Sequence, residues 1–530
     1  MQARALHTSI ALLAAALLFV VAINWGTRAA GGSDSACYLT EARLLEHGTT
    51  HIEQPLIAAA PWPRAEWTFT PAGHVPSPVN RTFIVPICPP GLPIAMAAMR
   101  LLRGELFVVP LTGAIAVWLT FLLGRRIDGV PTGAAAAVLL ACSPIVLFQV
   151  VQPMTDVPAM MWWLLVAVLA IGSEDRGPRP LAAGLAASFA VLTRPNLLPL
   201  ALVIAAFPAM RRRPVIYVLG LVPGIVLLAL LQNAMYGSPF ATGYGAASDL
   251  FRASHVPENL QRYLRWLISS HTPVFVLALA APFVIDRRRA AWLGLILSAM
   301  TLAVYLPYTV FDDWWYVRFL LPAIPWLIVL TVSVIRRLAI LAAPRRAGAL
   351  VLLAVAALAA IWLRNARAGS AFELVRLERH FLDAGHFAAE RLPPDAAVLT
   401  VRHSGAVWYY AQRPTLSWDT LEPGSLDRAL GFLRSRQLTP FLLLDVAEEP
   451  VFRARFEAAS PIGRLDWPPL ASVGRTVRVY DPADRDRYFA AAGGSRNLSR
   501  NPPVQLRVWE TSATPFVRFA SSPSLPPSRF

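Results

Sequence analysis

Long uncharged apolar stretches are the feature that most constrains this chain. A helix needs about 20 such residues to cross a bilayer, and only a helix or a closed barrel satisfies its backbone polar groups there. The chain is 56% hydrophobic and 15% charged, which excludes an ordinary soluble globular protein. The pattern predicts an α-helical polytopic membrane protein with about eleven transmembrane helices, at Thr8–Thr27, Leu106–Leu123, Gly133–Val151, Val157–Gly172, Leu181–Thr193, Asn196–Met210, Val215–Met235, Pro273–Ile285, Ala291–Tyr308, Phe319–Ile335 and Ala347–Leu363.

The basic residues indicate how the chain is oriented. All 48 Lys and Arg residues are Arg, and they recur in short clusters between the apolar stretches. Basic clusters concentrate on the cytoplasmic side of membrane proteins. An N-terminus in the cytoplasm places all five clusters there, at 125–126, 176–179, 211–213, 287–289 and 336–346. We therefore expect a multi-pass protein of the cytoplasmic (inner) membrane, and we do not attribute the net charge of +16 to nucleic-acid binding.

The chain divides by composition into a membrane part and two further segments. Residues 1–368 hold the spans, and residues 28–105 form a long first outer loop rich in Pro, Trp and His. Residues 369–488 have the composition of a soluble domain, and the same topology places it outside the cytoplasm. Helical and strand patterns alternate there, which predicts a small α/β domain with strands at Ala397–Val401, Phe441–Asp445 and Thr476–Tyr480. Residues 489–530 are rich in Pro, Ser and Arg and are expected to be disordered.

Two short helices are predicted in the first outer loop, both lying along the membrane surface. One spans the Gly31–Gly48 stretch, and the other comes from the apolar run Val85–Gly104, which is too short to span comfortably. The first has an apolar face and a polar face, formed by Tyr38, Leu39, Ala42 and Leu45 and by Glu41, Arg43 and Glu46.

Asp34 and Asp156 occupy equivalent positions, each at the predicted start of a helix on the outer side. Two interpretations are open for both residues. Asp is a favoured helix N-cap, which requires no chemistry. Acidic residues at a membrane interface that face a polar cavity are also functional candidates, because burying them is costly. Two such residues on one side of the membrane strengthen the second interpretation.

Arginine and aromatic residues complete the candidate site. Arg194 and Arg318 lie at outer ends of spans, and two interpretations are open for them. Their guanidinium groups suit a lipid-linked phosphate, and an Arg at the end of a span also commonly extends to the lipid headgroups. Trp315, in the run 314–316, fits an interfacial aromatic belt or a sugar-stacking surface. Tyr244, in the Gly- and Pro-rich loop 236–245, and Tyr38 are placed with Trp315 along a substrate cavity.

The cysteines form no metal-binding pattern, since the three present, at 37, 88 and 142, show no CxxC spacing. Cys37 and Cys88 both fall in the first outer loop, where an oxidising compartment would allow them to pair. We expect two buried free thiols as the commoner case, and the pairing stays open.

These features together resemble the GT-C glycosyltransferases, particularly the bacterial branch related to protein O-mannosyltransferases and lipid A aminoarabinose transferases. The resemblance covers roughly residues 8–363 and rests on the order of its motifs. These are an Asp after the first span, a Pro-Pro-Gly interfacial helix, Thr-Asp-Val-Pro, Arg-Pro, Tyr-Gly-Ser-Pro-Phe and a Trp followed by Arg-Phe-Leu-Leu-Pro.

The resemblance implies transfer of a sugar from a polyprenyl-phosphate carrier to an acceptor on the outer face of the membrane, with inversion at the anomeric carbon. Asp34 would then be the base, Asp156 a second acidic site residue, and Arg318, with Arg194, a contact to the donor phosphate. Many relatives have Asp-Glu at the first motif, whereas Ser35 follows Asp34 here, which weakens metal binding at that position. We assign no metal ligand and no certain cofactor, and a divalent cation stays open.

Two other classes of function compete with a glycosyltransferase. A polyprenol-linked flippase or secondary transporter predicts internal repeats and charges near the middle of spans, and we find neither in the sequence. A silent assembly scaffold would make Asp34 and Asp156 replaceable. The sequence does not identify the sugar, or whether the acceptor is a lipid, a glycan or a protein.

Overall fold

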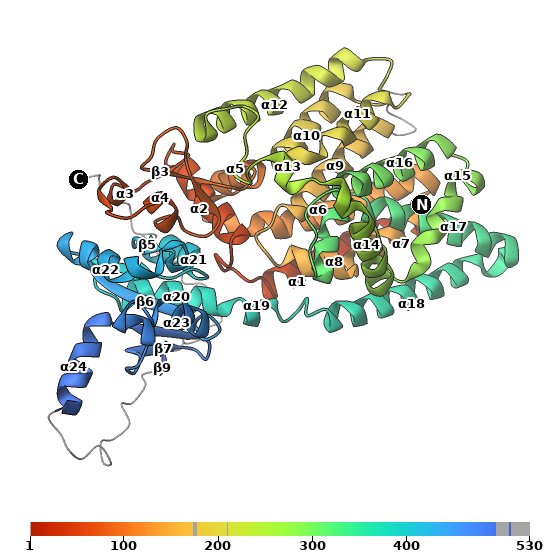
Figure 1. Cartoon of the computed structure of the whole chain (residues 1–530). Coiled ribbons are helices and arrows are strands. Elements are labelled where there is room, and N and C mark those ends of the chain that lie inside the picture. Colours follow the sequence, from red (N-terminus) through yellow and green to blue (C-terminus); the bar gives the residue numbers. More distant parts are fainter. Residues whose placement is uncertain (1, 173–176, 209, 494–507, 510–530) are drawn as a thin grey trace.

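The apolar helices form one bundle in the computed structural model, which describes residues 2–172, 177–208, 210–493 and 508–509 (Figure 1). Within these residues, five helices are long and apolar enough to cross a membrane. They are α1 (Gln2–Asn24), α6 (Val108–Asp128), α12 (Pro214–Tyr236), α17 (Ile324–Ala342) and α18 (Ala347–Ala368). The chain is therefore a multi-pass membrane protein.

Two further pairs of helices reach spanning length only if each bent pair counts as one span. In the first pair, α7 (Val130–Ala141) meets α8 (Pro144–Val150) at an angle of 59°. In the second pair, the helical segment Ala253–His271 meets the segment Pro273–Val284 at 101°. These two segments contain α14 (Val256–His271) and α15 (Ala281–Val284). Both breaks precede a proline, whose ring disfavours helical backbone in the residue before it. The remaining apolar helices are α9 (Asp156–Ile171), α10 (Pro180–Thr193), α11 (Leu198–Ala206) and α16 (Arg288–Tyr305). The count of eleven complete spans is thus not confirmed, although each predicted stretch contains helix.

Small residues allow the helices α10 and α12 to pack closely. A Cβ atom at Gly184 would lie 2.1 Å from the Tyr217 carbonyl oxygen, and one at Gly220 would lie 2.5 Å from that of Leu181. Ser188 also donates from its hydroxyl to the Gly220 carbonyl. Such contacts stabilise helix pairs in lipid, where burial of apolar surface adds little.

The first outer loop folds over one end of the bundle. It contains α2 (Asp34–Glu46), α5 (Gly91–Arg100) and the short helices α3 (Leu56–Ala59) and α4 (Ala65–Thr68). A small antiparallel sheet has the order β1-β3-β2, with strands at Ile52–Glu53, Phe83–Pro86 and His74–Pro76.

The helix α2 is more buried than its predicted polar face suggests, and its position along the membrane surface stays a prediction. All residues from Ser35 to Ala42 are buried, including Glu41 on the predicted polar face. Arg43, on the same face, donates to the Tyr409 carbonyl at 2.6 Å and stacks over the Tyr409 ring. The C-terminal part of the chain covers Arg43, whereas Glu41 lies against Cys88 and Glu46 pairs with Arg100 of α5. The spacing of apolar residues along a helix cannot reveal these contacts.

The segment after α18 folds around a mixed sheet with the strand order β5-β4-β6-β8-β7-β9. The strands β5, β4 and β6 are parallel, and β8 pairs antiparallel with β6. The strands are β4 (Ala396–Leu399), β5 (Thr415–Leu416), β6 (Thr439–Asp445), β7 (Ala471–Val473), β8 (Val477–Tyr480) and β9 (Val508–Trp509). The helices are α19 (Leu374–Leu377), α20 (Arg379–Glu390), α21 (Ser404–Ala411), α22 (Leu426–Ser435), α23 (Glu449–Phe456) and α24 (Pro482–Gly493).

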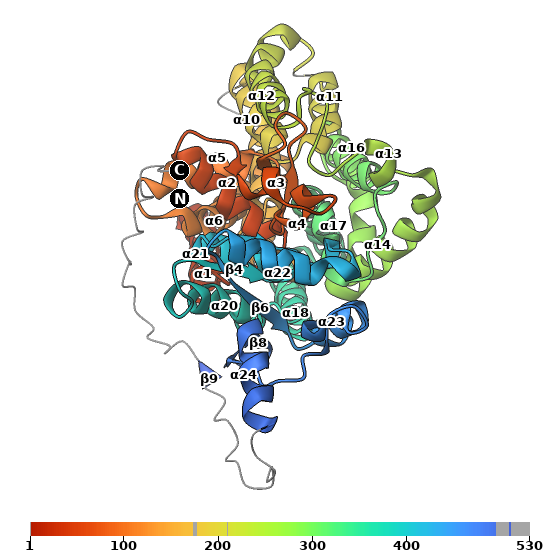
Figure 2. The same cartoon turned by 60° about the vertical axis from the view of Figure 1, so that its left-hand side comes forward.

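This C-terminal unit and the first outer loop share a hydrophobic core. Trp62 of the loop packs edge-on against Phe432 of α22, with ring centroids 5.4 Å apart. The Ser417 N–H donates to the Thr68 carbonyl at 2.7 Å. Figures 1 and 2 both show the loop between the bundle and the C-terminal unit. The loop therefore links the two parts of the molecule.

Most of the predicted disordered tail, residues 489–530, lies outside the described residues. Its described residues are helical up to Gly493, in α24, and Val508–Trp509 form β9, which pairs parallel with β7.

Candidate functional site

A cavity of about 460 Å³ lies at the end of the bundle that the first loop covers. Its walls come from α2, the Ile87–Pro90 segment, the ends of α10, α12 and α16, and the chain just before α17. Five of the seven predicted site residues line it, namely Asp34, Tyr38, Arg194, Tyr244 and Arg318. Asp156 and Trp315 are not among the lining residues.

Asp34 is the most accessible acid of the cavity. The helix α2 begins at Asp34, and Ser33 occupies the N-cap position. The Asp34 carboxylate accepts a hydrogen bond from Arg318 Nη2 at 3.2 Å, and its side chain is 34% exposed. The geometry thus disagrees with the N-cap interpretation of Asp34. It presents a carboxylate group to the cavity beside the Arg318 guanidinium group.

Asp156 begins α9 in the same way but is completely buried. Its Oδ1 atom lies 2.5 Å from Arg194 Nη2, and its side chain has no exposed surface. Its second oxygen, Oδ2, has no hydrogen-bond partner among the described residues. The preceding residue, Thr155, lines the cavity instead. Asp156 therefore pairs with Arg194 on the buried side of the guanidinium group and does not itself line the cavity.

The two arginines are held by aromatic rings and acids together. Arg194 donates to the Tyr305 hydroxyl at 3.0 Å, and its guanidinium carbon lies 5.2 Å from the Phe319 ring. Arg318 lies over Tyr316 and Phe319, and its Nε atom has no partner among the described residues. Burial lowers the pKa of Arg318, but Asp156 and Asp34 raise it, and the net shift is upward. Both groups stay charged and are suited to an anion.

Tyr38 extends the polar side of the cavity from α2. Its hydroxyl forms a hydrogen bond of 3.0 Å with the Thr155 hydroxyl. Burial, followed by the nearby Asp34 charge, raises the pKa of Tyr38 far above its usual range. The hydroxyl is therefore neutral at physiological pH and can donate a hydrogen bond.

A disulfide bond joins Cys37 of α2 to Cys88, so the expectation of two free thiols is wrong. The sequence separation of 51 residues gave no indication that the two residues meet. The bond fixes α2 beside the Ile87–Pro90 segment, and Cys88 itself lines the cavity. Cys142 is free.

The predicted aromatic wall is only partly in place. Tyr244 lines the cavity, whereas the Trp315 ring stacks on Phe148, with centroids 5.7 Å apart. The next residue, Tyr316, lines the cavity in its place. The turn at 314–320 is a 3-10 helix, and a change of one position moves a side chain to another face. Tyr305 and Phe319 were missed because both appear in sequence as ordinary residues near the ends of apolar spans.

The cavity holds no group of three metal-ligating side chains among the described residues. The group that the described part of the chain does contain, His380, His403 and Asp445, lies in the C-terminal unit. It has no counterpart in the predicted site.

No family model matches this sequence, and no curated protein matches it. Solved structures do match it. ArnT from Cupriavidus metallidurans in the apo state has a TM-score of 0.58 at 14% identity, over 88% of this chain and 96% of that chain. The same protein bound to undecaprenyl phosphate has a TM-score of 0.55 at 13% identity, over 88% and 97%. The Archaeoglobus fulgidus oligosaccharyltransferase has a TM-score of 0.54 at 13% identity, over 87% and 73%.

The chain has the GT-C fold. Because the similarity extends to almost nine-tenths of this chain, it includes residues of the covering loop and of the C-terminal unit as well as the apolar helices.

Proposed function

We propose that this protein is a membrane glycosyltransferase that moves a sugar from a polyprenyl-phosphate donor to an acceptor on the outer face of the cytoplasmic membrane. The observation that carries the proposal is one cavity that combines the accessible Asp34 carboxylate with the Arg318 and Arg194 guanidinium groups. The fold of glycosyltransferases supports it, as does the undecaprenyl phosphate bound to one of the similar structures.

A single displacement at the anomeric carbon fits the residues of this cavity. The acceptor oxygen attacks the anomeric carbon and its proton passes to the Asp34 carboxylate, while the bond from that carbon to the phosphate oxygen breaks. Polyprenyl phosphate leaves with the electron pair. A phosphate leaving group needs positive charge rather than an acid, and Arg318 and Arg194 supply that charge. One base on the face opposite the leaving group leads to inversion of configuration.

Asp156 takes a supporting role in this proposal and not a catalytic one. Its buried Oδ1 atom lies 2.5 Å from Arg194 Nη2 and fixes that guanidinium group. Arg318 contacts Asp34 directly, so one guanidinium group adjoins the acid while its remaining donors are available to the phosphate on the other side of the anomeric carbon. Neutral Tyr38 and the aromatic walls, including Tyr244, provide contacts for a sugar ring.

In this proposal the cavity and the C-terminal unit lie on the outer side of the membrane, and the distribution of the Arg clusters in the sequence supports that orientation. The partners are then a lipid-linked sugar and a lipid, glycan or protein acceptor. No set of three metal-ligating side chains accompanies Asp34 among the described residues of the cavity, and a single displacement with Asp34 as base needs no cation.

The test is transfer of radiolabelled sugar in membranes that contain the wild-type protein, supplied with a panel of polyprenyl-phosphate sugars. We expect transfer from at least one donor, a product of inverted anomeric configuration, and inhibition by added polyprenyl phosphate. Retention of configuration would contradict a single displacement. Movement of labelled donor across the membrane of sealed vesicles without any sugar transfer would favour the flippase. If no donor is either transferred or moved across the membrane, a scaffold would be favoured.

A further inference from the structure

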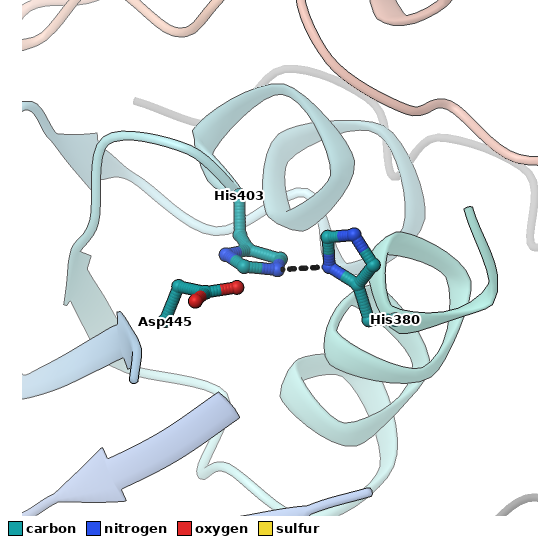
Figure 3. Close-up of side chains that lie close together, drawn as sticks. All are labelled: His380, His403 and Asp445. Atoms are coloured by element: carbon teal, nitrogen blue, oxygen red, sulfur yellow. Dashed lines mark hydrogen bonds between the residues drawn. The ribbon is translucent and has the colours of Figure 1, made fainter. Parts of the chain in front are cut away.

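A compact group of metal-ligating side chains lies in the C-terminal unit, outside the GT-C cavity. His380 is the second residue of α20, His403 immediately precedes α21, and Asp445 ends β6 (Figure 3). One ligand atom from each residue lies within 4.8 Å of the others. Figure 3 shows the two imidazole rings and the carboxylate turned toward one another.

We propose that His380, His403 and Asp445 bind one zinc ion that joins α20, α21 and β6. Two imidazole nitrogens and one carboxylate oxygen are ligands that Zn²⁺ commonly takes, with water in a fourth position. The proposal does not depend on the glycosyltransferase activity, because it concerns a separate part of the chain.

The spacing of the two nitrogens is close to that of a zinc site. His380 Nδ1 lies 2.9 Å from His403 Nε2. A tetrahedral ion with Zn–N bonds of about 2.0 Å separates its ligands by roughly 3.3 Å, so a small opening of the pair admits the ion. The carboxylate has to approach further, from a separation of up to 4.8 Å.

The carboxylate is already oriented for this role. Asp445 Oδ1 accepts a hydrogen bond from the Ala447 N–H at 3.0 Å, which leaves Oδ2 for a second partner. Such outer contacts orient metal ligands in known sites. The guanidinium group of Arg402 lies 4.0 Å from Oδ2, but this side chain is 52% exposed and can move into solvent.

Hydrogen bonding alone does not satisfy the histidine pair. His403 is completely buried, and its Nδ1 atom has no partner among the described residues. This unpaired nitrogen is distinct from Nε2, the atom that faces His380 Nδ1 and would bind the ion. His380 is only partly buried and gives an ion a route from solvent.

The site lies next to the contact between the C-terminal unit and α2. Ser404, the residue after His403, accepts a hydrogen bond from the Ala72 N–H at 2.9 Å. A Cβ atom at Gly405 would lie 2.6 Å from the Ala36 side chain, so α21 packs directly on α2. A bound ion would hold the start of α21 in the position that this contact requires.

The test uses the full-length protein, purified in detergent without a histidine tag and freed of metal with a chelator. Zinc chloride is added and bound zinc is counted after gel filtration, and cobalt chloride is used as a spectroscopic probe. We expect one zinc ion per chain, an intense tetrahedral cobalt spectrum that zinc displaces, and a higher thermal midpoint with zinc. Absence of a stoichiometric zinc ion, or a weak octahedral cobalt spectrum, would overturn the proposal.

Variants place the ion on these residues. His380→Ala and Asp445→Asn should weaken zinc binding at least tenfold. His386→Ala is the matched control, because His386 lies on the same helix α20 but pairs with Glu390 and stacks on Tyr410. Zinc binding that survives His380→Ala, or that is lost in His386→Ala, would contradict the site. If a variant fails to fold, the wild-type cobalt spectrum still decides.

Discussion

The starts of α2 and α9 are alike in sequence and different in structure. Each helix begins with an Asp that is paired with an Arg, Asp34 with Arg318 and Asp156 with Arg194. Asp34 is 34% exposed and lines the cavity, whereas Asp156 has no exposed side-chain surface. An accessible acid can exchange a proton with a substrate, and a buried acid can only position its partner. The same residue type in the same local setting thus differs in its access to the cavity, and the two proposed roles follow from that difference.

The largest expected effect is the loss of stability in Asp156→Asn. Removing one charge leaves buried Arg194 without its counter-ion, which typically costs about 3–5 kcal/mol. We expect a clearly lower thermal midpoint of the purified protein in detergent. The control is Asp484→Asn, which removes an Asp from the first turn of α24 that pairs with Arg487 at the surface. An unchanged midpoint in Asp156→Asn would show that the buried pair does not hold this region.

The pair also predicts non-additivity. The double variant Asp156→Asn with Arg194→Gln removes both charges, so it should be more stable than Asp156→Asn alone. The measurement compares the thermal midpoint of the double variant with those of the wild type and of the two single variants. A double variant that loses the sum of the two single effects would contradict a direct pair.

A third acid, Glu41 of α2, extends the comparison of Asp34 with Asp156, because burial is the cause of its pKa shift. Burial raises the pKa of the Glu41 carboxyl from 4.5 to about 8. The folded protein then holds a proton that the unfolded chain loses above pH 4.5. Stability is therefore full below that pH and falls by a few kcal/mol as the pH rises through 8.

Glu41→Gln removes this titration. We expect the variant and the wild type to have similar thermal midpoints near pH 4.5 and the variant to be more stable at pH 8.5. The measurement is the thermal midpoint in detergent across this pH range. Parallel curves for the two proteins would mean that Glu41 is not buried as described.

A smaller effect is expected for Arg318→Lys. Lys keeps the charge but lacks the planar donor geometry that Arg offers to a phosphate. We expect KM for the polyprenyl-phosphate donor to rise roughly tenfold, with a smaller change in kcat. Arg376→Lys, at an exposed Arg paired with Glu373, should leave both constants unchanged. An equal response of the two variants would argue against a phosphate contact at Arg318.

The smallest effect concerns the aromatic residues that the sequence placed together. Tyr244 lines the cavity and Trp315 packs on Phe148, so the two should separate in a kinetic assay. Tyr244→Leu should raise KM for donor or acceptor a few-fold, and Trp315→Phe should leave KM unchanged. The reverse order would place Trp315 in the substrate path.

Apolar runs predicted the helices and the motif order predicted the GT-C fold, because both are properties of consecutive residues. The strands at 396–399, 439–445 and 477–480 also lie where their alternating patterns placed them. The predicted number of eleven spans is not confirmed, since the proline after Ser143 breaks one predicted span and the apolar helices at 156–171, 180–193 and 195–206 are shorter than 18 residues.

The sequence singled out the charged residues of the candidate site, but it did not predict which side chains contact one another. Asp34, Arg194 and Arg318 stood out because charge is rare in such a chain. The burial of Asp156, the Cys37–Cys88 bond and the place of Trp315 depend on distant segments that pack together. The same is true of His380 and His403, which lie 23 positions apart and meet only through the fold.

The central claim is that the accessible Asp34 is the base, and the most direct measurement is kcat of purified Asp34→Asn with donor at saturation. Asn keeps the shape and the helix start but cannot take the proton of the acceptor. We predict that kcat falls by roughly a thousandfold, within the usual contribution of a general base, while thermal midpoint and polyprenyl-phosphate affinity change little. A variant that transfers sugar at the wild-type rate would contradict the account.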